Sequence, residues 1–143
     1  MAEEACEMPR KNATTAEVRE ILGISRVIAV IGMSDNPERA SNRVAAYLMQ
    51  HGYRIIPVNP GKASILGQKC WPSLSAVPER VDIVDIFRKP SAVPAIVDEA
   101  IKAGAKVVWM QEGIVHNAAA EKARAAGLRV VMNRCMMKEH QAL

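Results

Sequence analysis

The fold of this protein is decided by the stretch RVIAVIGMSDNPERASNRV, residues 26–44. Its first part, Val27–Ile31, is an unbroken apolar run, which is typical of a strand covered by helices on both faces. Gly32 ends the run, a polar loop follows, and apolar residues return at helical spacing from Val44 onward. Strand, glycine turn and helix in this order predict the opening unit of an open α/β sheet, where a helix N-terminus can hold a phosphate group.

The remaining sequence continues the alternation of strands and helices. Further apolar runs occupy residues 53–58, 81–87, 107–110 and 128–132. Stretches with helical periodicity lie between most of them, and the composition does not change along the chain. This predicts one domain over residues 14–143, of class α/β, with a doubly wound, mainly parallel sheet of about five strands and helices on both faces. We expect residues 1–13 to form a flexible tail.

Local patterns predict how several elements begin or where they lie. Thr14 and Glu17 have the spacing of a capping box, so a short helix should follow them. Ser41 or Asn42 is expected to cap the helix after the first loop. Pro57 lies inside the second apolar run, which therefore belongs near the end or the edge of the sheet.

The third apolar run carries two carboxylates, Asp82 and Asp85. An ionised carboxylate is costly on a covered face of a sheet. At least one of the two is therefore expected to point to the rim of the sheet or to a helix N-terminus. Arg88 and Lys89, which follow the run, are candidate partners for Asp85.

The composition argues against several classes of protein. The formal net charge of +4 is spread along the chain, and only 3% of the residues are aromatic, so a nucleic-acid ligand is not expected. No apolar run reaches the length of a membrane span or a signal sequence. Cys6, Cys70 and Cys135 are widely spaced and odd in number, so we expect reduced thiols, no metal site and a cytoplasmic protein.

Polar clusters containing glycine, proline or charged residues follow the predicted strand ends. They are Gly32–Arg43, Asn59–Lys62, Arg88–Pro90, Gln111–Gly113 and Asn133–Cys135. The carboxyl ends of parallel strands share one edge of the sheet, where ligands bind in open α/β folds. We therefore expect one groove for a polyanionic ligand, lined together by Ser34, Lys62 and Glu112.

The loops after the first two strands distinguish between nucleotide ligands. A dinucleotide site needs a GxGxxG loop after the first strand and an acidic residue after the second. The first loop of this chain has a single glycine, Gly32, and the second loop places Lys62 where NAD requires a carboxylate. NAD is therefore disfavoured, and Lys62 suits a phosphorylated ribose such as that of NADP or coenzyme A.

From about Val27 to Cys135 the chain resembles a known family. The motifs that carry the resemblance are Gly32-x-Ser34, Arg39-x-Ser41-x-Arg43, Val58–Lys62 with Leu66-Gly67, Val84–Arg88, Trp109–Gly113 and Met132–Cys135. They are similar to those of the small stand-alone coenzyme A-binding proteins. The Rossmann-like domain of that family is related to the N-terminal domain of the succinyl-CoA synthetase α subunit.

The resemblance implies a site for coenzyme A (CoA) or an acyl-CoA at the carboxyl rim. The residues implied are Gly32, Met33, Ser34, Arg39, Ser41, Arg43, Asn59, Pro60, Lys62, Phe87, Arg88, Lys89, Pro90, Gln111, Glu112, Gly113 and Asn133. The first loop is expected at the phosphates and the turn with Lys62 at the ribose phosphate or adenine. The loop 87–90 would line the cleft, and 111–113 would lie towards the pantetheine arm. The synthetase domain that carries the phosphorylated histidine has no counterpart in residues 1–143, so the resemblance implies binding and not ligation.

Other functions remain open from the residues alone. The chain could be an NADP-linked reductase, or an acyl transferase that uses Cys135 beside Arg134 as nucleophile. Glu112 is placed for acid–base chemistry, although a hydrogen-bonding role is the simpler interpretation. A protein-interaction module is the third possibility, because the N-terminal helix and residues 136–143 have no assigned role. No complete catalytic set is present, so a non-catalytic binding, sensor or carrier module is the hypothesis that we favour, with an unknown protein partner.

Overall fold

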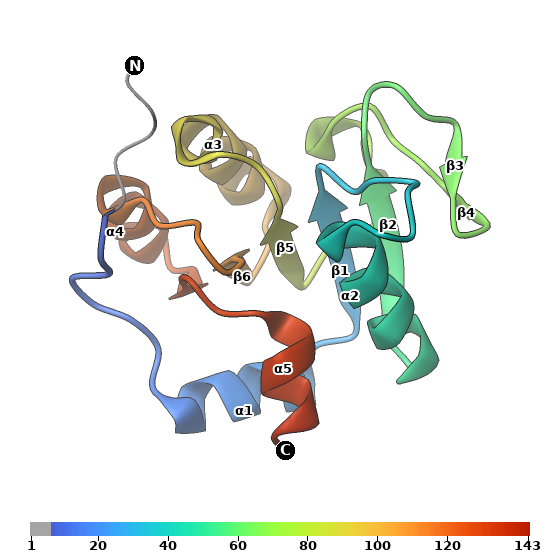
Figure 1. Ribbon diagram of the computed structural model, residues 1–143. Coiled ribbons are helices and arrows are strands. Elements are labelled where there is room, and N and C mark those ends of the chain that lie inside the picture. The colour runs from blue at the N-terminus through green and yellow to red at the C-terminus, as the bar shows by residue number, and fades with distance from the viewer. Residues whose placement is uncertain (1–6) are drawn as a thin grey trace.

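A five-stranded parallel sheet forms the centre of the protein (Figure 1), whose computed structural model describes residues 7–143. The strands run in the spatial order β2-β1-β5-β6-β7, and every neighbouring pair is parallel. Their bounds are β1 (Val27–Ile31), β2 (Arg54–Val58), β5 (Ile83–Ile86), β6 (Val107–Met110) and β7 (Arg129–Val131). The predicted α/β class with a parallel, Rossmann-like sheet of about five strands is confirmed. The edge position of the strand containing Pro57 is also confirmed.

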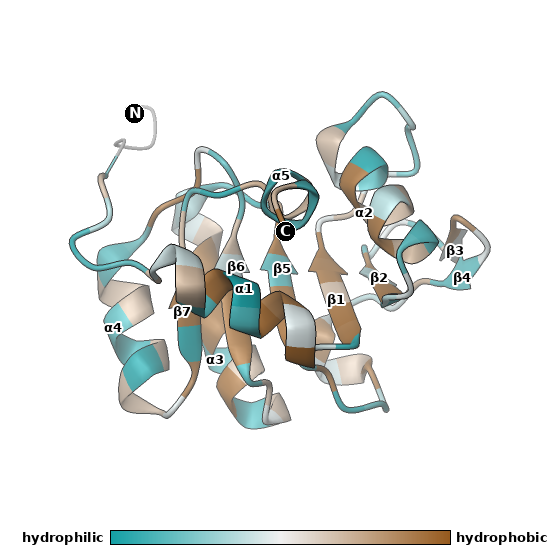
Figure 2. Cartoon of the chain, turned by 90° about the horizontal axis from the view of Figure 1, so that it is seen from below, coloured by the Kyte–Doolittle hydropathy of each residue, from teal (hydrophilic) through white to brown (hydrophobic). Residues whose placement is uncertain are grey.

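Helices cover both faces of the sheet, as predicted. One face packs against α1 (Thr15–Ile24), α2 (Ala40–Gln50) and α5 (Met136–Gln141), and the other against α3 (Val93–Ala103) and α4 (Asn117–Ala125). Figure 2 shows the mainly hydrophobic strands with α1 and α5 in front of them. Alternate strand residues supply the two halves of the core, because successive side chains of a strand point to opposite faces.

The beginnings of α1 and α2 follow different rules. The predicted capping box of α1 is confirmed: Glu17 N–H donates to Thr14 Oγ1 (3.1 Å), and Thr14 N–H donates to Glu17 Oε1 (2.8 Å). The predicted cap of α2 is wrong. Arg39 occupies the N-cap position without a side-chain hydrogen bond, because the Ser41 and Asn42 side chains bond to the preceding loop.

Several short elements complete the fold. A hairpin of β3 (Ser64–Ile65) and β4 (Gln68–Lys69) follows β2, and Trp71 adds a single parallel bridge to the outer edge of β2 at Val58. The 3₁₀ turns η1 (Leu74–Ala76) and η2 (Pro90–Ala92) precede β5 and α3. The sequence did not predict α5.

The segment before α1 contacts the carboxyl end of β7 and the start of α4. Asn12 pairs with Met132 like a strand residue, since its Nδ2 donates to Met132 O (2.8 Å) and its Oδ1 accepts from Met132 N–H (2.9 Å). Arg10 N–H donates to Asn117 Oδ1 (2.8 Å). Contacts of the expected tail already begin at Glu7, whose Oε1 accepts from Asn117 N–H (3.0 Å). Residues 1–6, which include Cys6, lie outside the described residues.

The two aspartates of β5 and its flank have opposite environments. Asp82 lies at the rim of the sheet as expected, just before the amino end of β5. Its Oδ2 accepts from the N–H groups of Arg26 and Val27, both at 2.9 Å. Asp85 is completely buried, and burial raises the pKa of its carboxyl to about 7. Its hydrogen-bond partner is Gln111 Nε2 (2.6 Å), and the other carboxyl oxygen has no partner among the described residues.

The candidate pairing of Asp85 with Arg88 or Lys89 is therefore wrong. Both basic side chains are exposed on the loop after β5, whereas the Asp85 carboxyl lies inside the core. Gln111 instead links the carboxyl to the start of α5, because its Oε1 accepts from Met136 N–H (3.3 Å).

Two features that bear on function concern residues 7–143 only. In that part of the chain, no helix is long and apolar enough to cross a membrane. Nor does it contain a group of three or more His, Cys, Asp or Glu side chains placed to hold a metal ion.

Candidate functional site

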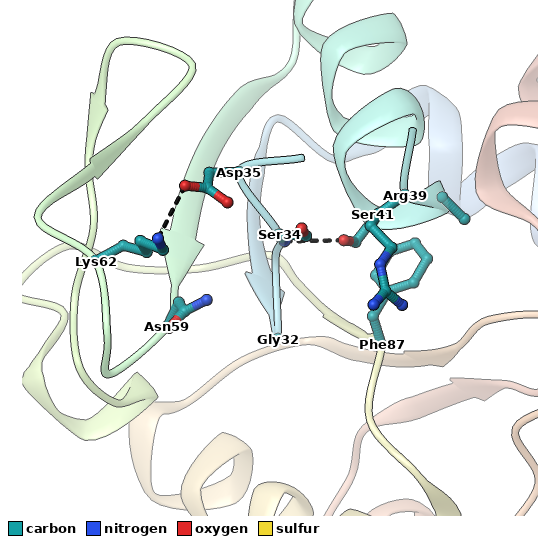
Figure 3. A pocket seen from close by; sticks show the side chains of 9 residues that line it. Gly32, Ser34, Asp35, Arg39, Ser41, Asn59, Lys62 and Phe87 are labelled. Atoms are coloured by element: carbon teal, nitrogen blue, oxygen red, sulfur yellow. Dashed lines mark hydrogen bonds and ion pairs between the residues drawn. The ribbon is translucent and has the colours of Figure 1, made fainter. Parts of the chain in front are cut away.

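A cavity of about 460 Å³ opens at the carboxyl ends of β1, β2 and β5. The strand order reverses between β1 and β5, and the loops leaving such a switch point diverge to form a crevice. The cavity is lined by Gly32, Ser34, Asp35, Arg39, Ala40, Ser41, Asn59, Lys62 and Phe87 (Figure 3). We call it the switch-point pocket.

Gly32 brings the first loop close to the loop after β5. Its N–H donates to Val58 O (3.0 Å), and its φ of +82° is one that side chains rarely allow. A Cβ at this position would lie 2.7 Å from both Phe87 O and Arg88 Cδ. Glycine is therefore required here for its backbone angle and for the space.

The first loop is held against the start of α2 by a short hydrogen-bond network. Ser34 N–H donates to Ser41 Oγ (2.9 Å), and Asn42 Nδ2 donates to Ser34 O (2.9 Å). Asn36 N–H in turn donates to Ser34 Oγ (3.0 Å). Both serine hydroxyls act as acceptors in these bonds, so each O–H remains able to donate to an anion in the pocket.

The N-terminus of α2 faces the same pocket. In the described part of the chain, no hydrogen bond is donated by the backbone N–H of Ala40 or Ser41. Exposed Arg39 lies at the N-cap, where a cation opposes the helix dipole unless an anion is nearby. The arrangement of two N–H groups, one guanidinium and two hydroxyls is suited to a phosphate.

The second loop supplies the opposite wall. Asn59 shapes this loop, because its Nδ2 donates to Met33 O (2.9 Å) and its Oδ1 accepts from Gly61 N–H (2.8 Å). Lys62 Nζ forms an ion pair with Asp35 Oδ2 (2.9 Å), as the dashed line in Figure 3 shows. The hydrogen bond from Lys62 lowers the pKa of Asp35 below its usual value, which favours the ionised form that an aspartate already has at neutral pH.

The expected single groove is divided between two cavities. Ser34 and Lys62 share the switch-point pocket, but Glu112 lines a second cavity of about 280 Å³. The residues around this second cavity are Asn12, Glu112, Met132, Asn133, Arg134, Cys135, Lys138 and Glu139. Lys138 Nζ pairs with Glu112 (3.1 Å), and Arg134 Nη1 lies 3.5 Å from Glu139 Oε2, so both basic groups face acidic ones.

Seven of the residues implied by the resemblance line the switch-point pocket. They are Gly32, Ser34, Arg39, Ser41, Asn59, Lys62 and Phe87. Glu112 and Asn133 line the second cavity instead. The sequence did not single out Asp35 and Ala40, although both belong to the loop that it marked as functional.

The other implied residues lie around these cavities without lining either one. Arg43, Pro60, Arg88, Lys89 and Gly113 are exposed, Pro90 starts η2, and Met33 and Gln111 are buried. Met33 contacts a residue that lines the switch-point pocket, because its carbonyl oxygen accepts a hydrogen bond from Asn59 Nδ2. Gly113 N–H donates to Asn133 Oδ1 (2.7 Å), which joins the loops after β6 and β7.

Several known proteins are similar to this chain in sequence, and a solved structure is also similar to it in fold. A solved structure of a hypothetical protein from Pyrococcus horikoshii OT3 is 45% identical, covers 99% of both chains and has a TM-score of 0.90. YneT of Bacillus subtilis (strain 168), described as uncharacterized, is 38% identical over 91% of this chain and 96% of its own length. An ADP-forming acetate–CoA ligase from Archaeoglobus fulgidus is 29% identical over 82% of this chain, which spans only 18% of the ligase.

The family profile described as CoA binding domain matches residues 26–141, most of the chain. The resemblance to stand-alone CoA-binding proteins is thereby confirmed, and the related synthetase that the comparisons show is the ADP-forming acetyl-CoA synthetase. With a parallel α/β sheet and a pocket at its switch point, the chain belongs to the CoA-binding domain family.

Proposed function

We propose that this protein binds CoA or an acyl-CoA in the switch-point pocket and acts as a binding module without chemistry of its own. The observation that carries the proposal is the convergence of Arg39, Lys62 and the uncapped start of α2 on one pocket. Membership of the CoA-binding domain family supports the choice of ligand. The volume of about 460 Å³ lies in the range of small-molecule sites.

The diphosphate of CoA is assigned to the first loop and the start of α2. There it would accept hydrogen bonds from the N–H groups of Ala40 and Ser41 and from the Ser34 and Ser41 hydroxyls. Arg39 supplies the positive charge that offsets the phosphates. Such an anion would also stabilise α2 itself, since it provides the N-terminal partner that the helix lacks.

The phosphate on the ribose of CoA is assigned to Lys62. This phosphate distinguishes CoA from dephospho-CoA. Lys62 suits it because the ammonium is a point charge on a flexible stem, on a turn that contains glycine, and can approach the phosphate from several directions. The adenine would then lie beside the same turn.

The pantetheine arm is assigned to the ends of β5 and β6, between the two cavities. Adjacent strands lie about 4.8 Å apart, so β1 and β6 are separated by about 10 Å at the rim. An extended arm spans that distance and would bring the thiol towards Glu112 and Asn133. Among the residues lining the second cavity there is no histidine to act as a base for Cys135, which supports binding without catalysis.

Titration calorimetry with CoA and dephospho-CoA tests the proposal. Wild-type protein should bind CoA more tightly than dephospho-CoA, and Lys62→Met should weaken CoA binding by about tenfold while leaving dephospho-CoA unchanged. Lys122→Met is the matched control, because Lys122 pairs with Asp98 on the far helices α3 and α4. The proposal is refuted if CoA does not bind, or if NADPH binds more tightly than CoA.

A further inference from the structure

Asp35 places a carboxylate inside a pocket that is otherwise suited to phosphates. Its Oδ2 lies 2.9 Å from Lys62 Nζ, and both residues line the switch-point pocket. Figure 3 shows the pair joining the loop after β1 to the loop after β2. The cation assigned to the ligand is thus already occupied by an anion of the protein.

The second cation of the pocket is not neutralised in this way. Within residues 7–143, Arg39 forms no ion pair, whereas Lys62 has Asp35. The carboxylate acts on one subsite only, the one opposite the start of α2. An aspartate carboxylate is ionised in the neutral range with or without a partner, and the contact with Lys62 lowers the pKa of Asp35 further.

We propose that the Asp35 carboxylate competes with the ribose phosphate of the ligand for the Lys62 ammonium. Asp35 holds the ammonium while no ligand is bound, and the ammonium moves to the ribose phosphate when the ligand binds. The proposal rests on the CoA-binding function proposed above. A phosphate monoester carries nearly two negative charges at neutral pH and three acceptor oxygens, so it outcompetes a single carboxylate. A ligand without this phosphate leaves the Asp35–Lys62 pair intact.

The pair is suited to exchange because it is weak. The side chains of Lys62 and Asp35 are 45% and 52% exposed. Exposed ion pairs are screened by water, and the flexible lysine stem allows Nζ to move to a new partner. The loop bearing Asp35 is anchored to α2, because Ser34 N–H donates to Ser41 Oγ. We therefore expect the ammonium to move rather than the carboxylate.

The contact therefore lowers the affinity for CoA by the free energy needed to break it. From the range typical of exposed pairs, Asp35→Asn should tighten CoA binding by about two- to fivefold. The gain requires Lys62, so it should vanish in the Lys62→Met background. It also requires the ribose phosphate, so dephospho-CoA should show no comparable gain.

Calorimetry on four proteins tests this inference: wild type, Asp35→Asn, Lys62→Met and the double variant, each titrated with CoA and with dephospho-CoA. Asp98→Asn is the matched control, because it removes the carboxylate of another exposed Lys–Asp pair on α3 and α4. It should leave both affinities unchanged. Thermal unfolding confirms that each variant is folded.

Three results would overturn the competitor role. They are the absence of a gain in Asp35→Asn, an equal gain in the Lys62→Met background, and an equal gain with dephospho-CoA. The last two would mean that Asp35 merely repels anions. Tight CoA binding by wild type without the Asp35 effect refutes this inference alone, whereas absence of CoA binding refutes the proposed function and this inference with it.

Discussion

Replacing Asp85 by asparagine should remove a pH dependence from the stability of this protein. The folded state raises the pKa of the Asp85 carboxyl from its usual 3.8 to about 7, mainly because it is buried. Between these pH values the unfolded chain carries an ionised Asp85, whereas the folded chain keeps the proton. Folding then takes up a proton, so the contribution of Asp85 to stability falls as the pH rises and becomes constant above about pH 7.

The size of the effect follows from the pKa difference. One pKa unit corresponds to about 1.4 kcal/mol, so between pH 5 and pH 8 the wild-type free energy of unfolding should fall by about 3 kcal/mol through Asp85. Asparagine has the same shape, and its Oδ1 can accept the bond from Gln111 Nε2 that Asp85 accepts at 2.6 Å. It cannot ionise, so this part of the slope should disappear.

Urea unfolding at several pH values measures both slopes. The informative quantity is the wild-type value minus the Asp85→Asn value at each pH, because the other titrating groups cancel in the difference. Asp82→Asn serves as a control for the loss of a carboxylate at the rim. The reasoning would be refuted if the difference between wild type and Asp85→Asn did not change with pH, or if it changed in the opposite direction.

The fold suggests three further tests. Gly32→Ala should lower the free energy of unfolding by about 2 kcal/mol or more, because the alanine would have a positive φ and its Cβ would clash with Phe87 O and Arg88. Gly104 also has a positive φ but lies in open space, so Gly104→Ala should lower it by only about 1 kcal/mol. Urea unfolding of both variants separates the two causes. Asn12→Ala removes both hydrogen bonds to Met132 and should destabilise the protein by about 1–2 kcal/mol. Hydrogen exchange at the Met132 amide should then accelerate, and an unchanged exchange rate would contradict the hydrogen bond from Met132 N–H to Asn12 Oδ1. Cys135→Ser should leave the calorimetric affinity for CoA within about twofold, because the residues assigned to the phosphates line the switch-point pocket, whereas Cys135 lines the second cavity near the end of the pantetheine arm, where serine keeps the shape of the side chain. A larger loss would favour a role for the thiol.

Local sequence patterns were sufficient for most elements of the fold, and α5 is the helix that they did not predict. An unbroken apolar run predicted β1, and the capping box of Thr14 and Glu17 predicted the start of α1, because both signals depend on neighbouring residues. The α2 cap was predicted wrongly for a related reason. Ser41 has the chemistry of an N-cap, but its hydroxyl accepts from Ser34 N–H across the loop, and no local pattern shows that competition.

The sequence by itself determined the parallel α/β sheet, the loops at its carboxyl rim and most of the side chains of the switch-point pocket. Only the tertiary structure decided which of these side chains meet. It separated Glu112 from Lys62, buried Asp85 against Gln111 and paired Asp35 with Lys62. Periodicity and turn residues act over a few positions, so they can be read along the chain. The partner of a charged group depends on distances between segments that become neighbours only when the sheet is assembled.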